Sequence, residues 1–490
     1  MYSTSISLLP LNQLASKFTK YLRGYPFYVS MDYLMTQSDR INHVLSSSVI
    51  VTFYRLWIPS LLGLLALTTA NIVDGLFIGN YVGSNALAAV NLIIPFFGIL
   101  FGLSFMFAMG GSVRAGKYIG EKNYTEASNI FSKTVIAIIS LVGLIILLGL
   151  TFETNVLRAL GGTDEVLPLM KTYYRITMGF IWTQLLTVAL YFFVRLDGYP
   201  NLASFALILG SAVNIGLDYL FVAHLGWGIA GAAWATGISQ ALPFIVLCSY
   251  FLQSNRHLNF YFHQTRWREL FQSAANGLSE FVNEISGAII VLILNWLFVL
   301  RYGVDGVAAF TILNYLLMIG MMFGFSIGEA GSIFISQNFG ARQVKRIQQF
   351  LLVSALNALV IAVIFIAFLV GFSEFLVTMF LPDNEMYVIE LANELMELVW
   401  PVFLVSGLTM IITSYLTALH LPKPSAIIAL SRSLVLPILL LLVLFKLLPE
   451  YPFILAIPLA ELFTFGIALF FFWYFPPKQQ TLDRITNGCA

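Results

Sequence analysis

The stretch Asn71-Ile72-Val73-Asp74-Gly75-Leu76-Phe77-Ile78-Gly79-Asn80 closes the first long apolar run of the chain. It places one carboxylate, Asp74, near the end of residues 59–78, which carry no other charge. An aspartate at the centre of a membrane helix costs roughly 2.5–3.5 kcal/mol, so such acids usually face a bundle interior or a wet cavity. A second acid, Asp218, follows an equally apolar run. We interpret both acids as functional; the alternative for Asp74 is a carboxylate that merely ends a helix at the water interface.

The composition indicates a membrane protein with many spans. Of the 490 residues, 59% are hydrophobic and 10% are charged, against about 25% charged in soluble domains, and the mean hydropathy is +0.87. The net charge of +1 gives no basis for nucleic-acid binding. The two cysteines, Cys248 and Cys489, do not have the spacing of a disulfide framework or of a metal site.

Hydropathy predicts an all-α polytopic fold with twelve transmembrane helices, at about 20 apolar residues per crossing. The expected spans are residues 51–79, 86–110, 126–150, 167–194, 201–223, 228–252, 270–299, 306–332, 347–372, 386–418, 425–447 and 452–475.

The distribution of Lys and Arg predicts the orientation. With the N-terminus in the cytoplasm, all but five of the 25 basic residues lie on the cytoplasmic side. The five exceptions are Arg158, Lys171, Arg175, Arg301 and Lys446. Because the number of spans is even, we expect a multi-pass plasma (inner) membrane protein with both termini in the cytoplasm.

The chain also repeats itself. A shift of 220 residues places Gly83 on Gly303, and Gly120 on Gly340, without a gap. The same shift aligns Ala88-Ala89 with Ala308-Ala309 and Gly111-Ser112 with Gly331-Ser332. A chance match among small residues is the alternative. Since 220 residues hold six spans, we expect two six-helix lobes related by a pseudo-two-fold axis along the membrane normal, with substrate between them and alternating access.

These patterns predict the domain limits. The parts are a cytoplasmic N-terminal tail (1–48), an N-lobe (49–252), a cytoplasmic linker (253–269), a C-lobe (270–475) and a cytoplasmic C-terminal tail (476–490). Nothing before about residue 41 resembles packed structure, so a start at Met31 or Met35 is an open alternative for the tail.

Several motifs carry a family resemblance. They are Asp74-Gly-Leu-Phe-Ile-Gly79 with Gly83 and Leu87-Ala-Ala89, Gly111-Ser112 with Gly120, Arg195 with Gly198 and Pro200, and Asn214 to Asp218 followed by Gly226-Trp-Gly228-Ile-Ala-Gly231-Ala-Ala-Trp-Ala-Thr236. With them, residues from about 50 to 475 resemble the multidrug and toxic compound extrusion (MATE) family, most specifically in the first half. The pattern is most similar to the DNA-damage-inducible (DinF-like) branch. The resemblance implies a secondary active efflux transporter without cofactors, which exchanges cationic or amphipathic drugs for inward H⁺ or Na⁺.

In that branch, the resemblance implies a cation site in the N-lobe made of Asp74, Asn214, Asp218 and Thr236. The residues themselves support this site, since Asn214 and Asp218 are four apart and share a helix face. Their oxygens suit a small cation such as Na⁺, and two close carboxylates suit a proton equally well. The alternative is that Asn214 and Asp218 only bridge helices. Pro59, about 22 Å before Asp74 along a helix, is the expected hinge, as the resemblance implies for some relatives.

The second half departs from this pattern, because Leu294 stands at the repeat position of Asp74. Glu280 and Glu284 are four apart in the seventh span, and Glu329 and Glu461 lie in the eighth and twelfth. Glu280 and Glu284 are candidates for a substrate or cation site in the C-lobe, or simply acids in cytoplasmic water. Candidate cavity-lining residues are Trp182, Gln184, Tyr191, Asn295 and Asn314.

Two rival functions follow from the same features. A flippase for lipid-linked oligosaccharides or lipids has a related architecture, but we expect it to have a strongly cationic cavity, whereas the acids stand out here. An intramembrane aspartyl enzyme also uses two acids, but no nucleophile or metal motif supports it, so we predict no enzymatic activity. We expect a monomer in the lipid bilayer that binds small toxic organic cations and no nucleic acid.

Overall fold

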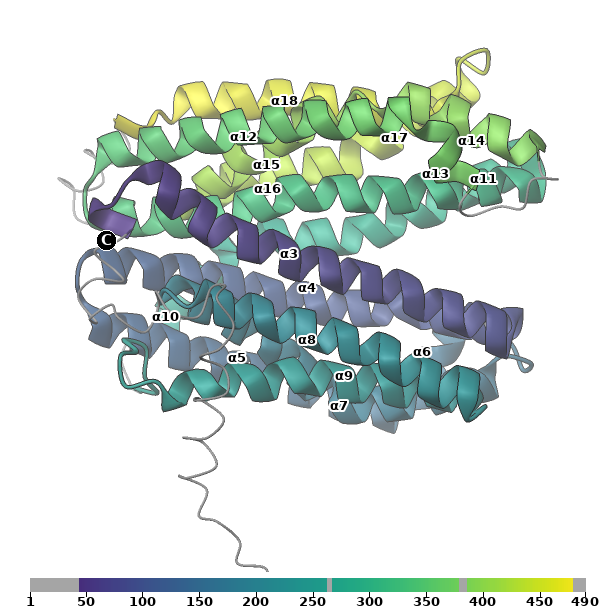
Figure 1. Ribbon diagram of the computed structural model, residues 1–490, viewed down its shortest axis with the longest axis horizontal. Helices are drawn as coiled ribbons and strands as arrows, with labels where there is room; N and C mark the ends of the chain where they lie inside the picture. Colours follow the sequence, from purple (N-terminus) through teal and green to yellow (C-terminus); the bar gives the residue numbers. More distant parts are fainter. Residues whose placement is uncertain (1–43, 262–266, 379–385, 479–490) are drawn as a thin grey trace, which may run out of the picture.

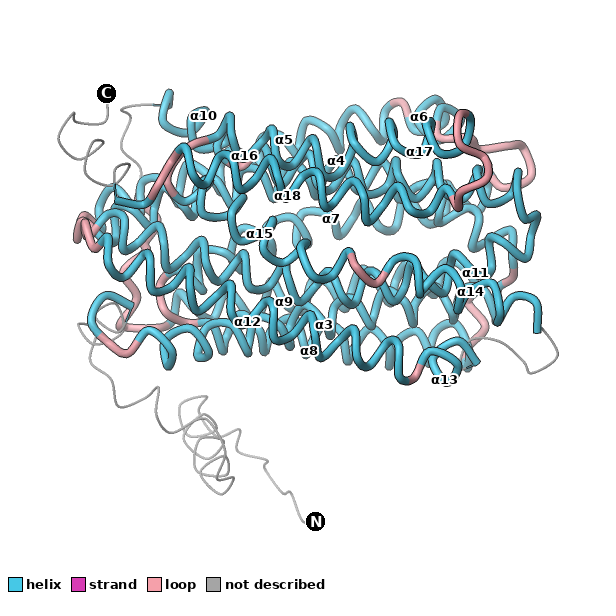
Figure 2. The backbone as a smooth tube through the Cα atoms, turned by 90° about the horizontal axis from the view of Figure 1, so that it is seen from above, coloured by secondary structure: helices cyan, strands magenta, loops and turns pink. Residues whose placement is uncertain are grey.

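The computed structural model of the protein describes residues 44–261, 267–378 and 386–478, which form helices and connecting turns without a β-strand (Figure 1). Nearly all of the expected N-terminal tail lies outside these residues, as do residues 262–266 of the linker and 479–490 of the C-terminal tail. Figures 1 and 2 show the long helices running side by side along the long axis of the molecule.

The described helices form two lobes. The N-lobe contains α3 (Val49–Phe77), η1 (Ile78–Val82), α4 (Ser84–Gly120), α5 (Tyr124–Thr151), α6 (Glu153–Ala159), α7 (Leu167–Leu196), α8 (Pro200–Asp218), η2 (Tyr219–His224), α9 (Gly228–Cys248) and η3 (Ser249–Leu252). After α10 (Trp267–Asn276), the C-lobe contains α11 (Leu278–Gly340), α12 (Val344–Gly371), α13 (Ser373–Thr378), α14 (Met386–Val399), α15 (Val402–Ala418), α16 (Pro422–Leu430), η4 (Ser431–Val435), α17 (Leu436–Lys446), η5 (Phe453–Leu455) and α18 (Ala456–Tyr474).

The predicted all-α polytopic fold is confirmed, with eleven to twelve candidate spans against the twelve predicted. Among the described residues, eleven helices are long and apolar enough to cross a membrane, and the pair α14 and α15, bent by 48°, makes the number twelve if it is counted as one broken span. The long helix α11 holds two of them, Leu278–Gly303 and Asp305–Gly340. They separate at Gly303, whose φ of 66° and ψ of −151° are not helical.

The predicted start of the seventh span at residue 270 is wrong. Residues 267–276 form the separate polar helix α10, and the span begins at Leu278. The turn at Gly277 explains the break. A Cβ at Gly277 would lie 2.1 Å from the carbonyl oxygen of Met106, so only glycine allows α4 to approach this closely.

The backbone repeats at the predicted offset of 220 residues. Lys122 and Arg342 both have a positive φ, 61° and 59°, directly after the helices that end at Gly120 and Gly340. Gly83 and Gly303, which open the preceding spans, also have a positive φ, 110° and 66°. A left-handed conformation is uncommon for residues other than glycine, so its recurrence at Lys122 and Arg342 is strong evidence that the two halves fold alike.

The two ends of the bundle differ in how the lobes meet. We call the end with α10 and residues 253–261 the linker end, at the left of Figure 1. One hydrophobic core runs from the N-lobe into the linker-end half of the C-lobe, where it includes Phe334 and Tyr415. The opposite half of the C-lobe has a separate core, which includes Leu294 and Phe403. The lobes therefore share a core at the linker end and have separate cores toward the opposite end.

Candidate functional site

The two acids singled out in the sequence occupy matching places in the N-lobe. Asp74 lies in the last turn of α3, just before the π-helix η1, and Asp218 is the last residue of α8, just before the π-helix η2. A π-helix inserts an extra residue into a helical turn and occurs frequently at functional sites. Both acids therefore sit at a local break in regular α-helix.

The side chains of Asp74 and Asp218 lie next to each other. Asp218 is fully buried, and neither of its carboxylate oxygens has a hydrogen-bond partner among the described residues. Two ionised carboxylates are both acceptors, so they can hydrogen-bond each other only if one of them carries a proton. A proton or a small cation would satisfy these oxygens, which makes Asp218 the centre of the site.

Thr236 reaches the pair from α9, and its hydroxyl donates to the Oδ1 of Asp74 at 3.5 Å. Asn214 lies one turn before Asp218 on α8 and is 7% exposed, but its amide is not hydrogen-bonded to either acid in the described part of the chain. The structure thus brings Asp74, Asp218 and Thr236 together. Asn214 shares their helix face without a direct contact to the acids.

Tyr173 of α7 belongs to the same cluster and was not among the residues predicted from the sequence. Its ring is buried, and its hydroxyl neighbours Thr236 and both acids. No sequence signal marks this residue, because a tyrosine in an apolar span is ordinarily a packing residue and the fourth span holds several. Only the packing of α7 against α9 selects it.

Pro59 lies in the middle of α3, and the helix continues through it without interruption. The next residue, Ser60, is buried and donates its hydroxyl to the carbonyl oxygen of Leu56. Proline cannot donate the backbone bond of a regular helix, so α3 lacks one internal hydrogen bond at this point.

The candidate acids of the C-lobe differ in exposure. Glu280 is buried and lines a small cavity together with Asn283, Glu329 and Arg432, whereas Glu284 is exposed. The other two acids are ion-paired: Glu329 with Arg195, and Glu461 with Arg432. The second-half acids therefore lie in a network with two arginines.

The candidate cavity-lining residues are divided between the two lobes. The ring of Trp182 lies against Gly143 of α5, inside the N-lobe, and Gln184 is buried. Tyr191 donates a hydrogen bond to Glu329 of the other lobe. Asn295 and Asn314 lie in the two spans of α11, and both are partly exposed.

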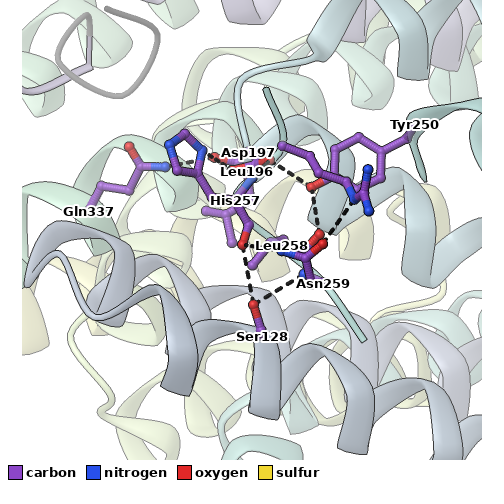
Figure 3. A network of polar contacts seen from close by, with 9 residues as sticks. Ser128, Leu196, Asp197, Tyr250, His257, Leu258, Asn259 and Gln337 are labelled. Atoms are coloured by element: carbon purple, nitrogen blue, oxygen red, sulfur yellow. Dashed lines mark hydrogen bonds and ion pairs between the residues drawn. The ribbon is translucent and has the colours of Figure 1, made fainter. Parts of the chain in front are cut away.

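A polar network holds residues 253–261 against the N-lobe (Figure 3). Asp197 accepts hydrogen bonds from the Tyr250 hydroxyl at 2.6 Å and from the backbone N–H of His257 at 2.9 Å, and its other oxygen lies 2.9 Å from the His257 ring. The hydroxyls of Ser128 and Ser132 accept from the backbone N–H groups of Asn259 and Tyr261. This half of the linker is therefore a packed part of the N-lobe.

The comparisons with known proteins agree with this architecture. The family model MatE matches residues 59–220 and 281–443, one match in each lobe. The probable multidrug resistance protein YoeA of Bacillus subtilis (strain 168) is 26% identical over 369 residues, which cover 74% of this chain and 79% of that protein. The multidrug export protein MepA of Staphylococcus aureus (strain MSSA476) is 23% identical over 409 residues, covering 83% of this chain and 90% of that protein.

A solved structure of a MATE protein in complex with MaL6 has the same fold. Its TM-score is 0.82 at 21% sequence identity, and the alignment covers 90% of this chain and 98% of that one. The family matches fall on both lobes and together cover more than half of the chain. The chain therefore belongs to the MatE family and is a multi-pass MATE multidrug efflux transporter, not an enzyme.

Proposed function

We propose that this transporter exports cationic and amphipathic drugs in exchange for H⁺ or Na⁺ entering the cell, by alternating access of a site between its lobes. The observation that carries the coupling role is the buried, unpartnered carboxylate of Asp218 beside Asp74. In a buried site, two adjacent carboxylates are stable only with a proton on one or a cation between them. The names of the relatives, multidrug resistance and multidrug export, support the substrate class.

The coupling step follows from this chemistry. Binding of one H⁺ or Na⁺ at Asp74 and Asp218 removes one of the two negative charges of the pair and changes how α3 and α8 interact, while Thr236 and Tyr173 supply hydroxyl oxygens. An ion shifts a two-state equilibrium only by its differential affinity for the two states, so drug and ion must favour different arrangements of the N-lobe. Both H⁺ and Na⁺ fit the oxygen set of this site.

The orientation and the limits of the parts belong to the same proposal. The linker end carries most of the basic residues, so we place it in the cytoplasm together with both chain ends. Residues 1–48 and 476–490 are then cytoplasmic tails, and the protein works as a monomer within the bilayer. A lipid-linked oligosaccharide flippase is disfavoured, because we expect it to have a strongly cationic cavity, whereas in the described part of the chain Arg195 and Arg432 are each paired with a glutamate.

Transport by the purified protein in proteoliposomes tests this function. We expect uptake or release of ethidium or a fluoroquinolone to follow an imposed pH or Na⁺ gradient, and to stop when the gradient is dissipated. Liposomes without protein, and liposomes with Asp218→Asn, are the controls. Drug movement that is insensitive to both gradients would contradict the antiport proposal.

A further inference from the structure

Arg195 and Glu329 form a buried ion pair between the two lobes. Arg195 lies in the last turn of α7 in the N-lobe, and Glu329 lies in the second span of α11 in the C-lobe. The Arg195 Nη1 is 2.7 Å from the Glu329 Oε2, and the two side chains are 0% and 3% exposed. A guanidinium and a carboxylate are thus held out of solvent at the boundary of two bodies that transport must move apart.

Neighbouring contacts tie the same two helices. The Tyr191 hydroxyl donates to the Glu329 Oε2 at 3.3 Å, and the Arg195 guanidinium lies over the Tyr191 ring at 4.5 Å. Eight residues further along α11, the Gln337 amide donates to the carbonyl oxygen of Leu196 at 2.8 Å (Figure 3). The end of α7 is therefore attached to α11 at two levels, about two helical turns apart.

The ion pair is incompletely satisfied. The Nε and Nη2 of Arg195 and the Oε1 of Glu329 have no hydrogen-bond partner among the described residues. Desolvation of such a pair offsets much of its attraction, so a buried salt bridge contributes little net stability, whereas removal of one partner is costly because it leaves the other charge alone. A contact of this kind suits a joint that forms and separates repeatedly.

Close backbone contacts seal the lobes beside this pair. A Cβ at Gly120 would lie 2.0 Å from the Gln337 carbonyl oxygen, and a Cβ at Gly340 would lie 2.0 Å from the Lys117 carbonyl oxygen. Adding 220 to 120 and 117 gives 340 and 337, so the two contacts are equivalent under the internal repeat. The seal therefore lies at the pseudo-two-fold axis, where α4 crosses the end of α11.

We propose that Arg195 and Glu329 are the ionic lock of a gate at the linker end. They hold the lobes together there, as in this structure, and separate each time that end opens. Tyr191 and Gln337 position the lock, and the glycine crossing at Gly120 and Gly340 is the seal that it secures. This proposal depends on the proposed function in one respect, because alternating access requires that the linker end opens during transport.

The test measures the distance between the lobes directly. Spin labels at Thr125→Cys and Lys345→Cys, exposed positions that correspond under the repeat, report the separation of α5 and α12 at the linker end. The background carries Cys248→Ala and Cys489→Ser. In nanodiscs, we expect Arg195→Met and Glu329→Gln each to raise the ratio of open to closed molecules about tenfold, which corresponds to about 1.4 kcal/mol.

Three further variants separate a lock from a general loss of stability. The double variant Arg195→Met with Glu329→Gln should shift the ratio no further than either single change, because the two residues act as one contact. Tyr191→Phe removes only one hydrogen bond and should shift the ratio less, in the same direction. Arg432→Met is the matched control: it breaks a buried pair with Glu461 inside one lobe and should leave the distance unchanged.

An unchanged distance distribution in both single variants would overturn the lock, as would an equal shift in Arg432→Met. If Arg195→Met does not yield monodisperse protein, Tyr191→Phe and Gln337→Leu decide the question alone. The readout needs neither drug nor ion. Failure of gradient-driven drug transport, together with opening in the variants, would therefore refute the antiport function while the lock stands.

Discussion

Asp218 is completely buried at the end of α8, and its oxygens accept no hydrogen bond from the described residues. Such a group is costly while ionised, and its cost falls when Asp74 or Asp218 is protonated or when a cation lies between them. We therefore propose that the charge of this pair, and not its shape, couples the ion to the drug. It also predicts that neutral variants keep the fold, because they remove a buried charge rather than create one.

Asp74→Asn and Asp218→Asn should each abolish gradient-driven efflux, measured as drug resistance of expressing cells and as transport in proteoliposomes. The yield of folded protein should be unchanged. Asp218→Asn should leave the free energy of unfolding equal or raise it by about 1–4 kcal/mol, measured as an equal or higher thermal midpoint. Asp305→Asn, at an exposed helix start near the opposite end, is the matched control and should transport normally. Normal resistance with Asp74→Asn would refute the site.

Tyr173→Phe tests the residue that only the structure revealed. Loss of its hydroxyl removes a neighbour of Thr236 and of both acids, so we expect ion affinity to fall about two- to tenfold, equivalent to about 0.5–1.5 kcal/mol for one hydrogen bond between neutral groups. The adjacent Tyr174→Phe is the control, because the Tyr174 hydroxyl has no hydrogen-bond partner among the described residues. Equal effects of the two changes would exclude a specific role for Tyr173.

The helix α3 departs from regular α-helical hydrogen bonding at two places. Pro59 removes one backbone bond, and the π-helix η1 follows directly after the helix that holds Asp74. The helix α3 also faces both lobes: Trp57 donates to the Ser326 hydroxyl of α11 at 3.0 Å, while the far end of α3 carries Asp74 into the N-lobe site. We therefore propose bending of α3 as a route from ion binding to the contact between the lobes.

Pro59→Ala should restore a helical N–H and stiffen α3. We expect drug binding to persist while its competition with the ion weakens, because the bend no longer links the two. Drug affinity in detergent at pH 6 and pH 8, with and without Na⁺, compares the wild type, Pro59→Ala and Asp74→Asn. Competition by neither ion in the wild type would rule out this mechanism, and competition that survives in Asp74→Asn would show that the ion binds elsewhere, with Glu280 and Glu284 as the next candidates.

The second contact between helices to test is the close crossing of α4 and α11. Gly340→Ala would place a methyl group against the Lys117 carbonyl oxygen, so we expect the closed linker end to lose about 1–3 kcal/mol. Gly331→Ala is the control, since a Cβ there meets no atom within 4 Å and alanine is the better helix former. The spin-label pair at Thr125 and Lys345 measures the opening of the linker end in both variants. An opening in Gly331→Ala as large as that in Gly340→Ala would contradict the proposed role of this crossing.

The distribution of Lys and Arg between the two ends of the molecule predicts which end faces the cytoplasm. Single cysteines at Glu121 and Gln343, at the linker end, should be labelled only from the cytoplasm, and those at Asp164 and Asp383 only from outside. Asp164 is exposed, whereas Asp383 lies outside the described residues. A cysteine-free background is the control, and labelling of position 121 from outside would invert the orientation.

The number of spans and the internal repeat could be predicted from the sequence, because hydropathy and glycine spacing are local properties of the chain. Three members of the proposed N-lobe site, Asp74, Asp218 and Thr236, followed from the family resemblance and, for the two acids, from their apolar surroundings in the sequence. The separate helix α10 escaped prediction, since its break depends on the close approach of Met106 to Gly277. Tyr173 escaped for the same reason, because a tyrosine among many becomes a site residue only through the packing of α7 on α9.

The contact between lobes is the part that tertiary structure alone decided. Arg195 appeared in the sequence as a motif residue and a cytoplasmic charge, and Glu329 as an isolated acid in the eighth span. The two residues are 134 positions apart in the sequence, and nothing in the sequence indicates that their side chains lie 2.7 Å apart. Pairing between residues so far apart in the sequence depends on how the two lobes pack against each other. That packing is determined by the whole contact surface of both lobes and not by any local sequence pattern.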